Sequence, residues 1–184
     1  YISYKKGTLL KLNILSNWGQ NKSSDIYSFE LVSKLFFSPK NFKFQPTFSY
    51  TINSLFHFSN DELPYFYKEY LGGENYVRGY SPIPNQNYKY ENFIEVEQLI
   101  YQSIQTQYTI YPRVDIDGLE IGLDGIFFID CGLGKRMKNK FNFSNSIYGY
   151  GFGFRLFLSG FGYIGFDVGF NPISKLRIHL SDSN

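Results

Sequence analysis

The chain has 184 residues, of which 21% are aromatic, carries a formal net charge of +2, and contains one cysteine, two histidines and no alanine. The weak net charge and the lack of a dense basic stretch argue against a nucleic-acid partner, and a single cysteine excludes an internal disulfide. We expect no metal centre and no cofactor, and no apolar run approaches the ~20 residues of a membrane-spanning helix.

Apolar and polar residues alternate with period two in eight segments of the chain, which are residues 8–17, 26–37, 42–58, 93–102, 119–131, 147–158, 162–170 and 174–181. Aromatic and β-branched residues favour strands, and the lack of alanine disfavours helices. The clearest segment is 42–58. Most strands of soluble proteins have only roughly 3–10 residues, and this segment is longer, whereas a strand that crosses a bilayer needs about 9–11 residues. The pattern predicts an all-β fold, namely an antiparallel transmembrane β-barrel with about eight strands in this chain.

The two faces of these segments differ in chemistry. One face is apolar and aromatic, and the other carries charged residues, serine and glycine, as in a barrel with lipid outside and a wet lumen inside. A soluble lipocalin-like barrel or sandwich is the alternative, and it would bury the aromatic face. Strand length and the breadth of the aromatic face favour the membrane.

The connection between the third and fourth segments is much longer than a hairpin turn. It runs from about residue 59 to residue 90, and a loop of this length inside a compact unit is usually functional or disordered. We therefore treat residues 1–184 as a single transmembrane barrel domain with a long functional loop.

The loop contains the segment Gly72-Gly73-Glu74-Asn75-Tyr76-Val77-Arg78-Gly79-Tyr80. It resembles the lumen-folded loop of the surface-antigen, or BamA-type, superfamily of outer-membrane assembly and two-partner secretion barrels, whose hallmark is Val/Ile-Arg-Gly-Phe/Tyr. The run from Phe128 through Asp130 to Gly132 resembles that family's Phe-x-Asp-x-Gly element. Glu95 or Glu97 resembles its acidic residue on the first strand after the loop. The resemblance covers roughly residues 70–180.

The resemblance implies an internal contact between Arg78 and the barrel wall, which has a physical reason. A buried arginine is costly unless it is paired, and its planar fork fits a carboxylate. Period two places Glu95, Glu97 and Asp130 on the polar side of their strands, so both strands can offer a partner to Arg78. The last two residues of the motif would allow close backbone approach and pack beneath the loop. Alternatively, Arg78 is an exposed charge and the carboxylates are simply solvated.

Full-size members of that family have sixteen strands and soluble amino-terminal modules, whereas this chain has eight predicted strands. It is interpreted as a fragment of a longer chain, as a short member whose two copies join edge to edge, or as a small closed barrel. An eight-stranded lumen is filled by side chains. Half of a larger barrel, with an edge that must pair, is therefore favoured.

The resemblance implies a non-enzymatic insertase or translocase in the outer membrane of a Gram-negative-type bacterium, or in an organelle. Its partners would be outer-membrane lipid, client outer-membrane proteins, and either a second copy of the chain or the rest of a larger barrel. No catalytic constellation is found in the sequence. The alternatives are the membrane anchor of a patatin-like phospholipase and a structural or small-solute barrel.

Overall fold

The computed structural model describes residues 6–17, 25–39, 46–60, 62–82, 95–136, 138–172 and 176–183. Within these ranges the chain is all-β, with strands β1 (Lys6–Asn17), β2 (Ile26–Phe37), β3 (Thr47–Ser59), β4 (Glu69–Tyr70), β5 (Glu95–Val96), β6 (Gln98–Ile116), β7 (Leu119–Lys135), β8 (Ile147–Leu158), β9 (Gly162–Phe170) and β10 (Leu176–Ser183). The helical elements there are two short 3-10 turns, η1 (Tyr65–Tyr67) and η3 (Phe143–Asn145). No helix in the described ranges is long and apolar enough to cross a membrane.

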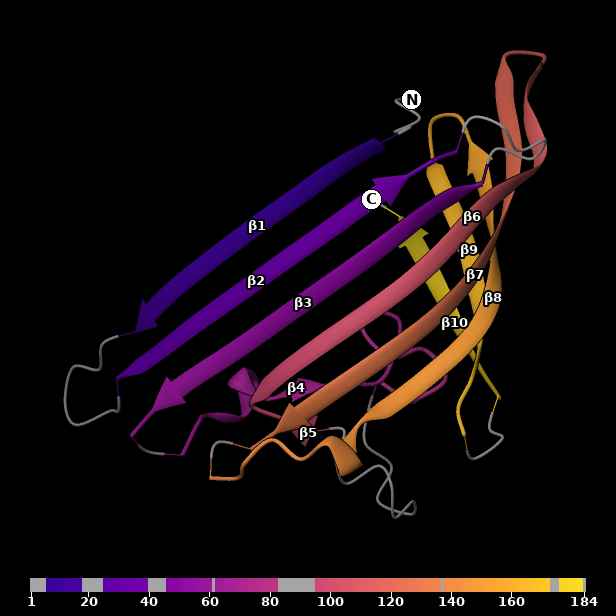
Figure 1. The fold of residues 1–184 in the computed structure, drawn as a ribbon. Helices are drawn as coiled ribbons and strands as arrows, with labels where there is room; N and C mark the ends of the chain where they lie inside the picture. The colour runs from indigo at the N-terminus through magenta and orange to yellow at the C-terminus, as the bar shows by residue number, and fades with distance from the viewer. Residues whose placement is uncertain are drawn as a thin grey trace.

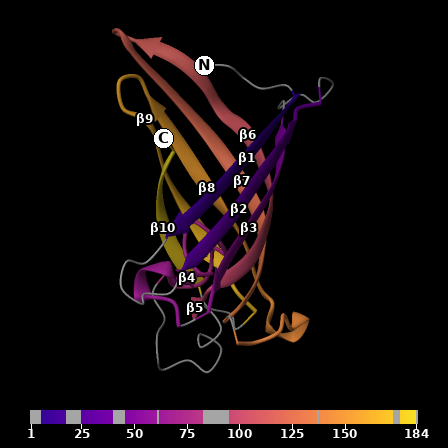
Figure 2. The same cartoon turned by 90° about the vertical axis from the view of Figure 1, so that its left-hand side faces the viewer.

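Eight of the strands form one antiparallel sheet in the order β1-β2-β3-β6-β7-β8-β9-β10, and β4 pairs with β5 in a separate two-stranded sheet. The large sheet curls, so that β8, β9 and β10 turn away from the plane of β1, β2 and β3 (Figures 1 and 2). Over the described residues, β1 and β10 are its two edges and do not pair with each other. The predicted all-β, eight-stranded antiparallel sheet is confirmed, whereas the small closed barrel is not formed.

Most strands lie within a few residues of their predicted positions, but β6 is much longer than the sequence indicated. It continues to Ile116, whereas alternation predicted an end at residue 102. Register shifts between Thr109 and Val114 interrupt its pairing with β7, and a proline, Pro112, lies within this irregular stretch. Bulges of this kind break period two, so alternation cannot reveal the strand there. The predicted strand residues 42–45, 93–94 and 174–175 lie outside the described residues.

A tight turn joins β6 to β7. Asp117 and Gly118 have φ values of 55° and 86°. Two central residues with positive φ are typical of a type I′ hairpin turn, for which Asp-Gly is a preferred sequence. This turn lets the two long strands extend together beyond their neighbours (Figure 1).

The two faces of the sheet differ in exposure. On the convex face, large apolar side chains are open, with Ile14 71%, Ile178 66% and Ile129 61% exposed. On the concave face, Asp130 and Asp167 are buried. Because successive side chains of a strand point to opposite faces, the aromatic set of the sequence lies outward. This is the reverse of the arrangement that a soluble barrel or sandwich would need.

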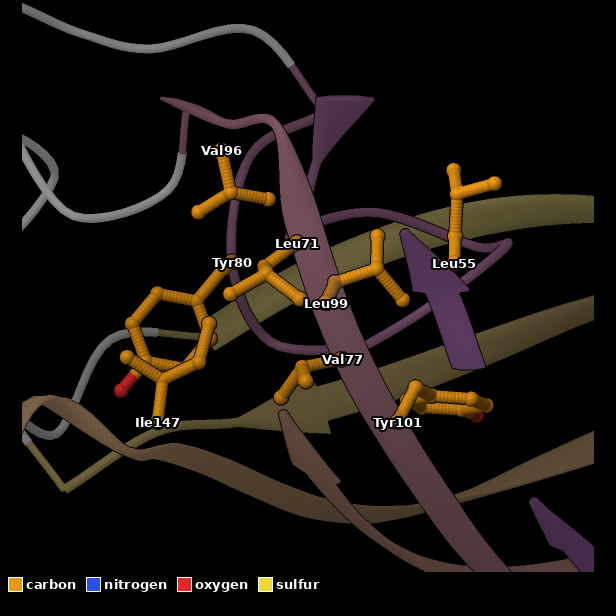
Figure 3. Close-up of a cluster of buried hydrophobic side chains, with 8 residues drawn as sticks. All are labelled: Leu55, Leu71, Val77, Tyr80, Val96, Leu99, Tyr101 and Ile147. Atoms are coloured by element: carbon orange, nitrogen blue, oxygen red, sulfur yellow. The ribbon is translucent and has the colours of Figure 1, made fainter. Parts of the chain in front are cut away.

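The described part of the long loop folds onto the concave side at one end of the sheet, where β4 pairs with β5 (Figure 1). Residues 61 and 83–90 of the predicted loop lie outside the described residues. Between loop and sheet lies a hydrophobic cluster (Figure 3), formed by Leu55, Leu71, Val77, Tyr80, Val96, Leu99, Tyr101 and Ile147. The apolar core therefore lies inside the curl of the sheet, and the loop supplies part of it.

Candidate functional site

The Arg78 loop, defined here as residues 69–82, turns back on itself before it meets the sheet. The Leu71 carbonyl accepts a hydrogen bond from the Val77 N–H at 2.8 Å, and Gly72 forms a parallel bridge with Val77. Leu71 and Val77 are fully buried in the cluster beneath the loop. Burial of these two side chains therefore holds Arg78 against the concave face.

The guanidinium of Arg78 forms a two-pronged ion pair with Asp130 of β7. Arg78 Nε donates to Asp130 Oδ2 at 2.8 Å and Nη2 donates to Oδ1 at 2.9 Å, while the backbone N–H donates to Oδ2 at 3.1 Å. Such forked contacts are strong and fix the relative orientation of the two groups. Asp130 is 0% and Arg78 6% exposed, so water does not compete for the pair. The structure thus brings together two residues that the sequence proposed as partners.

Neighbouring groups from β6 and β7 complete the surroundings of this ion pair. Ser103 Oγ donates to Asp130 Oδ1 at 2.7 Å, and the Tyr101 hydroxyl donates to the same oxygen at 3.3 Å. Arg78 Cζ lies 3.4 Å from the centroid of the buried Phe128 ring, a cation–π contact. A buried charge pair is stable only when its remaining hydrogen-bonding capacity is used, and these contacts use it.

Asp167 of β9 is a second carboxylate on Arg78, which the sequence did not identify as part of the site. Arg78 Nη1 donates to Asp167 Oδ2 at 3.0 Å. Arg155 of β8 reaches the same carboxylate, with Nη1 donating to Oδ1 at 2.7 Å and Nη2 to Oδ2 at 2.9 Å. The four side chains thus form a chain of ion pairs in the order Asp130, Arg78, Asp167, Arg155, and their two negative and two positive charges cancel. Alternation places Asp167 and Arg155 on the polar face, but it does not say which residues meet across strands.

The surroundings of Arg78 keep its side chain charged. Burial by itself lowers the pKa of the guanidinium, because it penalises the charged form. The hydrogen bonds and charge of Asp130 outweigh burial, so the pKa lies above its ordinary value. The guanidinium of Arg78 therefore stays charged over the whole physiological pH range.

Glycines in the wall make room for the loop. A Cβ on Gly149 of β8 would overlap the carbonyl oxygen of Arg78. A Cβ on Gly132 of β7 would lie 2.8 Å from Val77 Cγ2. Since real Cβ atoms do not approach other atoms so closely, these positions need glycine for the loop to lie flat against the sheet.

Of the remaining residues of the motif, Gly79 and Tyr80 lie where the sequence led us to expect them. Gly79 has a φ of 99°, and a Cβ there would lie 2.7 Å from the Phe170 carbonyl oxygen, so both backbone conformation and space require glycine. Gly73 has a φ of 101°. Tyr80 is buried in the hydrophobic cluster, and burial raises its pKa to about 12. Glu74 is exposed at the tip of the turn.

Glu95 and Glu97 do not form ion pairs with Arg78, whose ion pairs go to two aspartates. The Glu95 carboxylate instead lies 3.5 Å from Lys68 Nζ and 3.3 Å from Arg136 Nη2. Glu97 is buried immediately before β6. The prediction assumed that residues 93–102 form one strand, but β5 leaves the large sheet to pair with β4, so alternation does not carry through to this point.

A cavity of about 500 Å³ lies beside the ion pairs on the concave face. Its lining is largely polar and includes Lys34, Glu74, Gln105 and Arg155. In the part of the chain that the structure describes, no three histidine, cysteine, aspartate or glutamate side chains are grouped so as to hold a metal ion. The arrangement of charges is suited to anchoring a loop inside a hydrated space.

Comparisons with protein-family models, with curated proteins and with solved structures give no match to this chain.

Proposed function

We propose that this chain is the membrane-embedded half of an outer-membrane β-barrel of the protein insertion or translocation type. The observation that carries the proposal is the buried pair between Arg78 and Asp130, which anchors a loop inside a sheet whose outer face is apolar. A soluble protein would have to shield that outer face from water, because exposed apolar surface of this extent favours association. Lipid acyl chains against the outer face would cover this apolar surface.

The role of the Arg78 loop in this proposal is to stabilise the arrangement of strands from within. Through Arg78 the loop is bonded to Asp130 of β7 and Asp167 of β9, two strands that are not neighbours. A weakly closed seam elsewhere in the barrel could then open to admit client strands while this wall keeps its shape. The chain carries out no covalent chemistry in this scheme.

The two edge strands of the sheet, β1 and β10, indicate which partner the proposed barrel needs. Along the antiparallel sheet each strand reverses direction, so the first strand, β1, and the eighth, β10, run in opposite directions. A second copy rotated about the barrel axis would therefore offer β10 as an antiparallel neighbour to β1, and unpaired edges are not tolerated in lipid. The native mass of the full-length protein in detergent separates a pair of identical chains from a single longer chain.

The membrane assignment is tested by placing a charge on the outer face. Ile129→Lys should hinder insertion, since lysine at the bilayer midplane of a barrel costs about 2–4 kcal/mol. Flotation of the protein with phospholipid vesicles measures insertion. Asn75→Lys, on the exposed turn of the loop, is the matched control and should float as wild type does. Equal flotation of both variants and of wild type would contradict a lipid-facing sheet.

The assembly activity is tested in vesicles that contain the reconstituted protein. A urea-denatured outer-membrane β-barrel protein is added, and its conversion to the folded form is followed by its shifted mobility in unheated gels. We expect wild type and Arg136→Ala, which removes an exposed arginine, to accelerate folding, and Arg78→Ala to lose most of this effect. Folded Arg78→Ala protein that works as well as wild type would refute the proposed role of the loop.

A small-solute barrel is the second candidate, and the polar cavity beside Arg78 is the observation that favours it. It predicts ion conductance in planar bilayers without any acceleration of client folding. Conductance with no assembly activity would favour this candidate over the first.

A further inference from the structure

The backbone N–H and carbonyl of Gly79, directly after the arginine of the loop, are hydrogen-bonded to β10 and to the residue that follows β9. Its N–H donates to His179 Nε2 of β10 at 3.3 Å. Its carbonyl oxygen accepts a hydrogen bond from Asn171 Nδ2 at 2.9 Å, and Asn171 directly follows β9. His179 is 8% and Asn171 5% exposed, so both contacts are largely shielded from water.

The backbone of β9 leaves room for Gly79. A Cβ on Gly169 of β9 would overlap the nitrogen of Gly79. On the opposite side, a Cβ on Gly79 would press against the carbonyl of Phe170. The loop backbone thus lies in direct contact with β9, and it can do so only because both facing residues lack side chains.

The chemistry of the two partners is complementary to the backbone N–H and carbonyl of Gly79. His179 must offer an unprotonated Nε2 to accept from the N–H, and Asn171 must present its NH₂ group to donate to the carbonyl. Because a peptide group buried without partners is costly, each of these side chains contributes to holding the loop down.

The strand that carries His179 is an edge of the sheet. β10 pairs with β9 on one side, and over the described residues it has no strand on the other. The Arg78 loop is therefore bonded to the element whose pairing state can change when another strand approaches. The contacts of Arg78 with Asp130 and Asp167 leave this edge strand untouched.

We propose that His179 and Asn171 are positioning residues that couple the Arg78 loop to the open edge of the sheet. Through the backbone N–H and carbonyl of Gly79, displacement of β10 loosens the loop, and release of the loop loosens β10. Coupling between two sites is reciprocal, so each direction can be measured separately. This inference goes beyond the proposed function and holds whether or not the protein assembles clients.

Hydrogen–deuterium exchange of the full chain in detergent micelles tests the coupling from the edge towards the loop. Asn171→Asp exchanges a donor for a negative acceptor, and His179→Phe keeps a ring but removes the acceptor. Each should speed amide exchange in residues 71–80 about tenfold, the effect of losing one buried hydrogen bond. His179→Gln, which retains an acceptor, should lie closer to wild type. Ile178→Val, on the outward side of the same strand, is the matched control and should leave the loop unchanged.

The reverse direction uses Gly79→Ala, which forces a Cβ towards Phe170 and should speed exchange across residues 176–183. Unchanged loop exchange in both Asn171→Asp and His179→Phe, while Arg78→Ala still frees the loop, would overturn the coupling and leave the proposed function standing. Equal loosening by His179→Gln and His179→Phe would overturn the role of the acceptor. Fast exchange in β6 and β7 would show that a variant has unfolded globally. The coupling is then judged from the remaining variants among Asn171→Asp, His179→Phe and Gly79→Ala.

Discussion

The two ends of the sheet are built from the same alternating pattern but differ in how they are stabilised. In the wall formed by β7, β8 and β9, inward residues such as Asp130 and Asp167 are buried under the Arg78 loop. In β1, most residues are exposed, and the adjacent Leu9 and Leu10, which point to opposite faces, are 49% and 69% exposed. Alternation therefore makes a strand, but a core forms only where a second layer covers the inward face.

The comparison also explains why charged groups can lie at the centre of the covered wall. The loop brings its own arginine to a carboxylate, so the inward face gains a cover and charge compensation in one step. A purely apolar cover would have left Asp130 buried without a cation, which is strongly unfavourable. The uncovered inward face of β1 has no such need, because its polar residues remain accessible.

The largest expected effect comes from removing the anion beneath the loop. Asp130→Ala leaves the buried Arg78 without its forked partner, and breaking a buried pair in this way costs roughly 3–5 kcal/mol. Urea unfolding should show the loss as a lower midpoint at an unchanged slope. Asp124→Ala on the same strand is the control, because that carboxylate is only partly buried and bonds Gln107 and Tyr163. A loss for Asp124→Ala as large as that for Asp130→Ala would remove the contrast between covered and uncovered positions.

A smaller effect is expected from filling the space that the loop occupies. Gly149→Ala introduces a methyl group where the Arg78 carbonyl lies, and overpacking of this kind costs about 1–3 kcal/mol. Limited proteolysis within residues 71–80 should become faster as the loop is displaced. The neighbouring outward substitution Tyr148→Phe should leave both stability and proteolysis unchanged. A Gly149→Ala protein with a protected loop would show that the wall tolerates a side chain there.

The second carboxylate should matter less than the first. Asp167→Asn keeps the shape of the side chain but removes its charge, leaving Arg155 and one arm of Arg78 with a weaker partner, at a cost of about 1–3 kcal/mol. Thermal unfolding measures the loss. In a double-mutant cycle, Asp167→Asn and Arg78→Met should combine less than additively, since both act on one network. Simple additivity would mean that Asp167 serves Arg155 alone.

The smallest effect is expected at the uncovered edge. Asn13 of β1 donates to Glu30 of β2 at 2.7 Å, but the pair is only partly buried. Asn13→Ala should therefore change stability by no more than about 0.5 kcal/mol. Urea unfolding beside the Asp130→Ala protein measures the difference between the two walls. A loss of stability above about 2 kcal/mol would indicate that side chains of β1 contribute to stability as much as those of β7.

Local patterns in the sequence determined much of the fold. Period two predicted eight strands and which face of each is apolar, because the alternation of side chains along a strand is a property of the extended backbone itself. Gly79 was expected to allow close approach or a positive φ, a conformation that other residues adopt only at a cost. The resemblance of the motif to a known loop predicted a carboxylate partner for Arg78 among Glu95, Glu97 and Asp130, and of these three only Asp130 forms an ion pair with it.

Only the tertiary structure decided the rest of the site. Which carboxylate besides Asp130 receives Arg78 depends on how the strands are aligned across the sheet, where Asp167 lies opposite Gly153 and close to Arg155. The spacing of residues along one strand does not determine how that strand is aligned with its neighbours. Glu95 and Glu97 do not pair with Arg78 as predicted, because β5 pairs with β4 and is not part of the large sheet. Sequence alternation thus determines the faces of strands, whereas long-range pairing determines which residues meet.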